Sequence, residues 1–181
     1  MKILVVYSTT EGHTRKVSEF IADTLKESGH EVTVSNAAEQ PPTPLQFDAI
    51  IAGGSIHINH YQSAVTTYIR HNVDALNKMP AAFFSVCMAA ASKNEKEHRD
   101  AERITTEYLQ RMGWKPMLTA QVAGALKYTQ YGFFKRLVMK YIARKEGGST
   151  DTSNDHEYTD WNAVRQFVIR FAEKANATIS H

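Results

Sequence analysis

A short loop near the start of the chain concentrates groups that bind anions. The loop contains four residues with hydroxyl side chains, one glycine, one glutamate and one histidine. Its residues are Ser8, Thr9, Thr10, Glu11, Gly12, His13 and Thr14. Hydroxyls donate hydrogen bonds to phosphate oxygens, glycine lets a backbone approach a ligand, and the amides that open a following helix favour negative charge. The loop therefore predicts a phosphate site.

Two other types of phosphate loop do not match this one. A Walker loop needs a lysine before its last hydroxyl residue, and a dinucleotide fingerprint needs three glycines. The loop has no such lysine and only Gly12. The remaining alternative is that the Ser and Thr residues only cap the next helix. Four hydroxyl residues exceed what one cap requires, which favours the phosphate interpretation.

The loop lies between elements whose pattern predicts an α/β fold. Apolar runs predict strands over residues 1–7, 31–34, 49–52, 81–86 and 117–126, and amphipathic segments predict helices between them, with a last helix from near Thr159. Such alternation indicates a doubly wound parallel sheet with both faces covered. Five strands suit the order 2-1-3-4-5, in which ligands bind beyond the carboxyl ends of the strands.

Length and composition exclude several classes of protein. With 181 residues, 43% of them hydrophobic, we expect a single domain over residues 1–181. No apolar run reaches the roughly 18 residues of a membrane span, so the expected location is the cytoplasm. Cys87 is the only cysteine, which excludes an internal disulfide and a Cys-rich metal site, and we expect no metal. A net charge of +2 is too mild to indicate a nucleic-acid partner.

The first loop resembles the phosphate loop of the flavodoxin family. That family has the pattern Ser/Thr-x-Thr-x-Gly-x-Thr, matched here by Ser8, Thr10, Gly12 and Thr14. The resemblance implies a flavodoxin-like fold with flavin mononucleotide (FMN) as cofactor. It also implies that the loops after the third and fourth strands hold the flavin ring.

Those two loops contain the expected ring contacts. After the third strand, paired glycines would let main-chain amides approach the ring, and the expected contacts are Gly54, Ser55, Ile56, His57 and Tyr61. After the fourth strand they are Ser85, Val86, Cys87, Met88 and Ala89. The alternatives are ordinary packing for Tyr61 and Cys87, and solvation for His57 and His60.

A long segment, residues 127–158, separates the fifth strand from the last helix and is predicted to be an insertion. Basic and aromatic residues alternate in it at helical spacing, as in a helix that lies on an anionic membrane. The alternative is a helix packed on the domain with its charges solvated. The residues assigned to a substrate or membrane surface are Lys127, Tyr131, Phe133, Phe134, Lys135, Arg136, Lys140 and Arg144.

Further motifs, at residues 53–61, 122–128, 147–152 and 158–161, are similar to those of flavodoxin-like protoporphyrinogen IX dehydrogenases. The resemblance implies FMN-dependent oxidation of protoporphyrinogen IX, with electrons passed to menaquinone or a respiratory-chain partner. It implies further FMN contacts from Thr150, Asp151 and Thr152, and peripheral contact with the inner face of the cell membrane. Because the flavin carries the chemistry, no catalytic side chain or proton acceptor is assigned.

Three other functions are compatible with these motifs. The first is an electron carrier without a substrate of its own, and the second is a quinone reductase fed by NADH or NADPH. The third is an interaction domain that binds no flavin.

Overall fold

The computed structural model describes residues 1–57, 59–92, 94–126 and 156–180. Its centre is a five-stranded parallel sheet in the order β2-β1-β3-β4-β5, which confirms the predicted fold and strand order. The strands are β1 (Lys2–Tyr7), β2 (Glu31–Asn36), β3 (Ala49–Ser55), β4 (Ala81–Cys87) and β5 (Leu118–Ala123).

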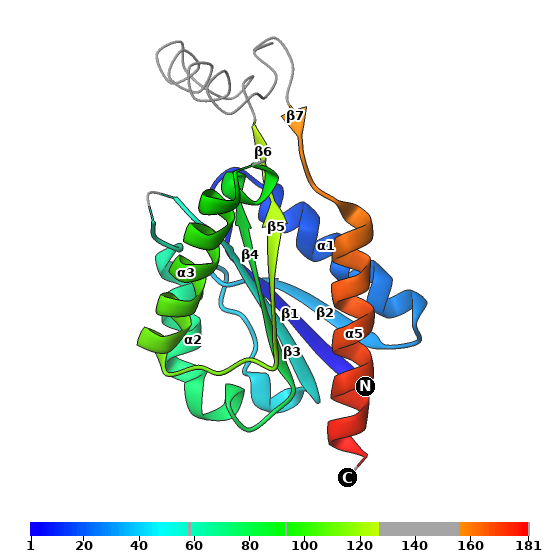
Figure 1. Ribbon diagram of the computed structural model, residues 1–181. Coiled ribbons are helices and arrows are strands. Elements are labelled where there is room, and N and C mark those ends of the chain that lie inside the picture. Colours follow the sequence, from blue (N-terminus) through cyan, green and yellow to red (C-terminus); the bar gives the residue numbers. More distant parts are fainter. Residues whose placement is uncertain (58, 93, 127–155, 181) are drawn as a thin grey trace.

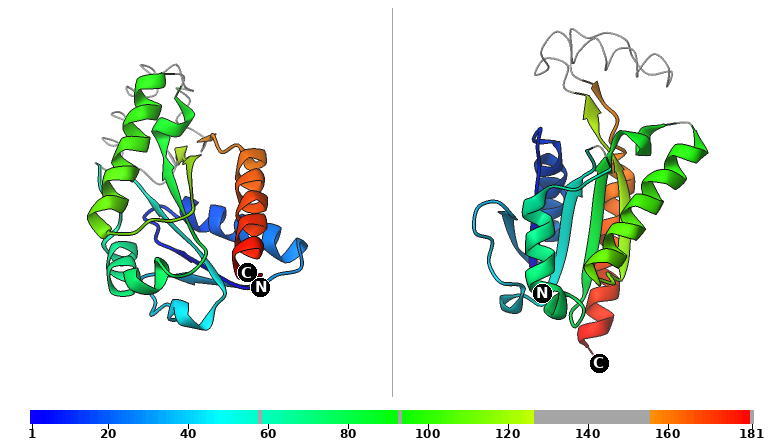
Figure 2. Two further views of the ribbon diagram at one scale, coloured as in Figure 1. Left: turned by 60° about the horizontal axis from the view of Figure 1, so that its bottom comes forward. Right: turned by 90° about the vertical axis from the view of Figure 1, so that its left-hand side faces the viewer.

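Helices cover both faces of the sheet (Figures 1 and 2). One face packs against α1 (His13–Glu27) and α5 (Trp161–Ile179), and the other against α2 (Ser63–Leu76) and α3 (Glu95–Met112). Two short 3₁₀ helices, η1 (Pro44–Gln46) and η2 (Met88–Ala91), lie in the connections.

The continuous apolar runs of the strands follow from this double cover. In β1, Ile3 and Val5 belong to the core under α1 and α5, whereas Leu4 and Val6 belong to the core under α2 and α3. All four side chains are fully buried. Successive side chains of a strand point to opposite faces, so a strand covered on both sides needs apolar residues at every position.

Three strands run further than predicted. The second ends at Asn36 instead of residue 34, the third at Ser55 instead of residue 52, and the fourth at Cys87, one residue later than predicted. Ser85 and Val86, also predicted as contacts from the loop after the fourth strand, lie in β4 as the predicted bounds of that strand have it. The polar and small side chains there can stay in the strands because they continue the same ladder, in which Gly54 pairs with Ser85.

The predicted fifth strand is interrupted at Gly124. The chain leaves the sheet there and forms β6 (Ala125–Leu126), which pairs antiparallel with β7 (His156–Glu157). The amide of Tyr158 donates to the carbonyl of Gly124 at 3.2 Å. Residues 156–158, which were assigned to the insertion, therefore already lie against the chain that precedes it. The single domain over residues 1–181 stays a prediction.

Candidate functional site

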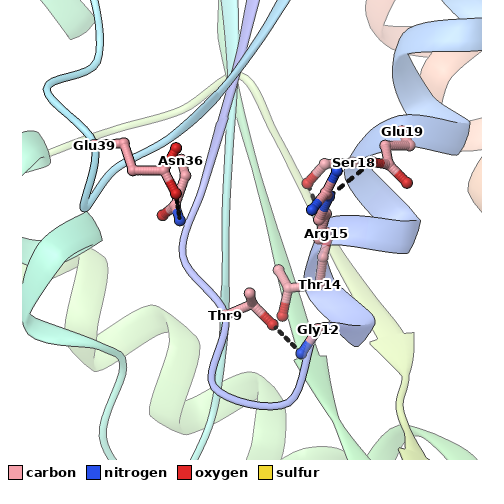
Figure 3. A network of polar contacts seen from close by, with 8 residues as sticks. All are labelled: Thr9, Gly12, Thr14, Arg15, Ser18, Glu19, Asn36 and Glu39. Atoms are coloured by element: carbon pink, nitrogen blue, oxygen red, sulfur yellow. Dashed lines mark hydrogen bonds and ion pairs between the residues drawn. The ribbon is translucent and has the colours of Figure 1, made fainter.

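The loop after β1 folds into a tight turn over the start of α1. The amide of Ser8 donates to the carbonyl of Gly53 in β3 at 3.0 Å, which ties the beginning of the loop to the neighbouring strand. At the other end Gly12 has φ 83°, a left-handed conformation that glycine adopts without strain. The amide of Gly12 donates to Thr9 Oγ1 at 2.8 Å across the turn (Figure 3).

Hydrogen-bond donors in this loop remain available to a ligand. Ser8 and Thr14 are buried, yet neither hydroxyl bonds to another residue in the described part of the chain. The amides of the first turn of a helix have no acceptor within the helix, and Gly12 gives α1 no side-chain cap. Buried donors at the positive end of a helix suit a phosphate dianion.

Gln62, at the start of α2, joins this loop to β3. Its Nε2 donates to Thr10 Oγ1 at 3.1 Å and to Ser55 Oγ at 2.5 Å, and its Oε1 accepts from the amide of Ser55 at 3.1 Å. Because the amide group donates hydrogen bonds through its nitrogen and accepts one through its oxygen, Gln62 fixes the distance between the loop after β1 and the end of β3. Sequence reasoning missed Gln62, because nothing in its type or neighbours indicates this bridge.

The loop after β3 forms a narrow turn with exposed imidazoles. His57 and His60 exchange two main-chain hydrogen bonds, of 2.9 and 3.0 Å, around Asn59, which has φ 63°. Before the turn, the amide of Ile56 donates to the carbonyl of Val86 in β4 at 2.9 Å. The loop after β3 is thus linked to the loop after β1 through Gln62 and to the end of β4 through Ile56.

The paired glycines of β3 make room for two side chains of this protein. A Cβ atom at Gly53 would lie 2.0 Å from Phe84 Cζ, and one at Gly54 would lie 3.0 Å from Tyr61 Cδ1. The space over each Cα is therefore filled by a side chain of this protein. The packing of Phe84 and Tyr61 is by itself a reason for glycine at both positions, and the contact of the main-chain amides with the flavin ring stays a prediction.

Tyr61 and Ser85 turn their side chains into the interior. Tyr61 Oη is 2.8 Å from Ser85 Oγ and 2.8 Å from Thr105 Oγ1, which also accepts from Gln121 Nε2 at 2.8 Å. Burial raises the pKa of Tyr61 to about 12, although its hydrogen bonds with Ser85 and Thr105 act in the opposite direction. The hydroxyls of Tyr61 and Ser85 thus bond to each other, and the predicted contacts of both residues with the cofactor stay predictions.

Cys87 packs at the end of β4, and its predicted contact with the cofactor stays a prediction. It is buried, and its Sγ lies 3.9 Å from Gln121 Oε1. Burial raises the pKa of the thiol, partly offset by hydrogen bonds from the amides of Ala90 and Ala89. The thiol is therefore held in its neutral form and is a poor nucleophile.

The first residue of α1 is held by the chain that leads into α5. His13 Nε2 lies 2.8 Å from Thr159 Oγ1, and Thr159 donates its single hydroxyl proton to the carbonyl of Ala123 at 2.8 Å. Since that proton is committed to Ala123, His13 must carry its own proton on Nε2. These two hydrogen bonds, which we call the relay from His13 through Thr159 to Ala123, fix the imidazole beside the phosphate loop.

A second contact next to it involves β7. Glu157 accepts hydrogen bonds from Lys16 Nζ at 2.5 Å and from Trp161 Nε1 at 2.8 Å. Burial acts to raise the pKa of Glu157, but these two hydrogen bonds outweigh it and hold the pKa below its ordinary value. The start of α1 is therefore attached to residues on the far side of segment 127–155.

Thr159→Val tests this attachment. The valine keeps the shape of threonine but removes one hydrogen-bond donor and one acceptor, so we expect the free energy of unfolding to fall by about 2 kcal/mol, about 1 kcal/mol for each bond. Urea titration followed by circular dichroism measures the change. Thr178→Val, which removes a hydroxyl bonded only within exposed α5, is the matched control. Equal stability of the two variants would contradict the relay.

With this geometry established, comparisons with known proteins identify the family. A family model described as flavodoxin domain matches residues 4–153. The chain belongs to the flavodoxin family.

Curated relatives of this flavodoxin share one name. The protein "Protoporphyrinogen IX dehydrogenase [quinone]" of Escherichia coli K12 is 35% identical over 173 residues, which cover 95% of each chain. A Leishmania major protein of the same name is also 35% identical, over 94% of this chain and 74% of its own. Oxidised flavodoxin 1 from Bacillus cereus has the same fold, with a TM-score of 0.58 at 19% identity over 96% of this chain and 98% of its own.

Flavodoxins bind FMN, and the loop after β1 fits the phosphate of that cofactor. The hydroxyls of Ser8 and Thr14, which have no partner among the residues that the structure describes, and the first turn of α1, which lacks a side-chain cap, supply the donors that a phosphate requires. Thr9 and Gln62 hold the loop in shape from either side. Which residues of this flavodoxin touch the cofactor stays a prediction.

The other predicted site residues fall into two groups. Ile56, His57, Met88 and Ala89 lie at the same edge of the sheet as the phosphate loop, His57 exposed and the others half-buried. The remaining predicted contacts lie outside the described residues: Thr150, Asp151 and Thr152 for the cofactor, and Lys127, Tyr131, Phe133, Phe134, Lys135, Arg136, Lys140 and Arg144 for the substrate or membrane surface.

Proposed function

We propose that this flavodoxin catalyses the FMN-dependent oxidation of protoporphyrinogen IX and passes the electrons to a quinone, with menaquinone as the acceptor. The observation that carries the proposal is the 35% identity to the quinone-linked E. coli dehydrogenase over 95% of both chains. The similarity therefore includes the sequence on both sides of β6 and β7, whereas oxidised flavodoxin 1 from Bacillus cereus is only 19% identical to this chain.

The residues of the chain have positioning roles in this reaction. Bound FMN would supply the electron-transfer chemistry, which no amino-acid side chain provides. Ser8 and Thr14 would hold the phosphate, and Gln62 would keep the loops after β1 and β3 at a fixed spacing. The hydrogen bond between the buried side chains of Tyr61 and Thr105 would keep the loop after β3 rigid, since neither hydroxyl can turn without leaving its partner unpaired.

Contact with a membrane surface is the second part of the proposal. No helix among the described residues is long and apolar enough to cross a bilayer. The contact would instead use the basic and aromatic residues predicted between Lys127 and Arg144. β6, which precedes these residues in the chain, lies beyond the carboxyl end of β5, at the end of the sheet where α1 begins (Figure 1).

Anaerobic turnover tests the proposal. The FMN-loaded protein is mixed with protoporphyrinogen IX, and the fluorescence of protoporphyrin IX is followed with and without a menaquinone analogue. We expect continuous product formation only with the quinone, because without an acceptor the reaction stops once the flavin is reduced. Flavin without protein and the apoprotein are the controls.

Other outcomes would replace the proposal with one of the alternatives. A flavin reduced by NADPH but not by protoporphyrinogen would indicate a nicotinamide-fed quinone reductase. A flavin reduced by neither would indicate an electron carrier. A purified protein that takes up no FMN would exclude both, and with them the proposed reaction.

A further inference from the structure

A cleft between α2 and α3 collects positive charge without a counterion. It has a volume of about 470 Å³ and is lined by Arg70 of α2, by Tyr108 and Arg111 of α3, and by His60 at its rim. Both arginines are exposed, and neither forms an ion pair within the described part of the chain. Glu107, the acid of α3 closest in sequence to both Tyr108 and Arg111, is already paired with Arg103 at 3.0 Å.

Both arginines act on a tyrosine that lines the same cleft. This residue is Tyr108, whose Oη lies 3.2 Å from Oγ1 of Thr66, another lining residue. Burial raises the pKa of Tyr108, and the charges of both Arg70 and Arg111 act to lower it. Arg70, Arg111 and Tyr108 therefore line one cleft and act on one another electrostatically. Two like charges in one cleft favour binding of an anion there.

We propose that this cleft binds the carboxylate groups of the tetrapyrrole substrate, an inference that rests on the proposed function. Arginine is the side chain best suited to carboxylates, because its planar fork donates two parallel hydrogen bonds. The substrate carries two propionates, and the cleft offers two guanidinium groups without a competing carboxylate.

The position of the cleft fits this role. Its rim is formed by Asn59, His60 and Tyr61, which belong to the loop predicted to lie against the flavin ring. Arg70 follows Ser63, the first residue of α2, by about two helical turns, or roughly 10 Å. With its carboxylates held at that depth, a tetrapyrrole would extend over the rim toward the carboxyl ends of β3 and β4.

The test compares binding and turnover in the FMN-loaded protein. The variants are Arg70→Gln, Arg111→Gln and the double variant, and Arg99→Gln is the control, since Arg99 lies on α3 outside the cleft and pairs with Glu95. Binding of protoporphyrin IX is measured by fluorescence. We expect the double variant to raise the Kd for protoporphyrin IX and the KM for protoporphyrinogen IX about tenfold or more, with kcat and FMN affinity unchanged.

The dimethyl ester of protoporphyrin gives a second comparison. It lacks both carboxylates, so the unmodified protein should bind the diacid more tightly than the diester, and the double variant should bind the two alike. Equal effects on the diacid and the diester, or an unchanged Kd for the diacid, would overturn the proposal.

Further outcomes separate this inference from the proposed function and from other anions. Arginine-dependent binding of protoporphyrin in a protein that does not turn over protoporphyrinogen would support the cleft and refute the reaction. Normal turnover of protoporphyrinogen IX with an unchanged KM in the double variant would support the proposed reaction and refute the role of the cleft. Loss of binding to vesicles of anionic phospholipid, with protoporphyrin binding intact, would assign the cleft to a lipid phosphate and overturn the proposal.

Discussion

Gly53→Ala should destabilise the protein more than any other substitution that adds a single methyl group to the sheet. The new Cβ would lie 2.0 Å from Phe84 Cζ and 2.1 Å from Phe84 Cε1. Phe84 is fully buried, so its ring cannot swing away into solvent. Overpacking of this kind costs about 3 kcal/mol, and we expect the free energy of unfolding in urea to fall by that amount.

Gly29→Ala is the matched control for this substitution. Gly29 has φ +83°, but nothing lies within 4 Å of its added Cβ. The free energy of unfolding of this variant should therefore fall by only about 1 kcal/mol, which is what an alanine in the left-handed conformation costs. If the two variants are equally stable, the contact between Gly53 and Phe84 is not what demands glycine.

A double variant identifies the partner in the clash. Gly53→Ala combined with Phe84→Leu removes the outer ring atoms that the new methyl group meets. The double variant should be more stable than the sum of the two single effects predicts, by at least about 1 kcal/mol, because the two residues are in direct contact. Strict additivity would contradict the steric explanation.

The second large effect is expected in the phosphate loop. Replacing Ser8 by Ala and Thr14 by Val removes the hydroxyls of two largely buried residues, and neither hydroxyl has a protein partner among the described residues. We expect the Kd for FMN to rise by a factor of about 10² to 10⁴, because each of the two hydrogen bonds to a charged group contributes about 1.5–3 kcal/mol. Titration of the apoprotein with FMN, followed by flavin fluorescence, measures the change.

Riboflavin provides the decisive comparison, because it has the same ring system and no phosphate. Its affinity should be the same for the double variant and the unmodified protein. Thr24→Val serves as the protein control, since Thr24 is a buried threonine of the same helix whose hydroxyl bonds to the carbonyl of Phe20 at 2.9 Å. A loss of affinity shared equally by FMN and riboflavin would show that the loop does not recognise phosphate.

The sequence was sufficient to predict the sheet because the signal for it is local. A strand buried on both faces needs apolar residues at every position, and runs such as residues 3–7 and 49–52 have them. Likewise, the hydroxyls and glycine of residues 8–14 lie next to one another in the chain, so their shared purpose could be inferred without knowing the fold.

The roles of Gly53 and Gly54 could not be predicted in the same way. They depend on Phe84 and Tyr61, and the ladder that places Gly53 opposite Phe84 is a property of the folded sheet. A pair of glycines after a strand has the same appearance whether a ligand or a neighbouring side chain occupies the space. Only the register between β3 and β4 distinguishes the two.

Gln62 and Thr159 escaped prediction for a related reason. Each is a polar residue next to a predicted helix, where its ordinary interpretation is a solvated or capping position. Their contacts with Thr10, Ser55 and His13 join parts of the chain that are distant in sequence. Thr159 lies within the motif at residues 158–161, but the motif by itself does not show which of its residues reaches α1.

The small ladder between β6 and β7 makes the enzyme modular. It brings residues 126 and 156 opposite each other, after the last strand of the main sheet and before its last helix. The segment that enters and leaves at this point can therefore change in length or composition without shifting any strand of the sheet or the attachment of Thr159 to His13. Within one family, evolution could exchange this segment to redirect the same flavin domain toward new substrates or partners.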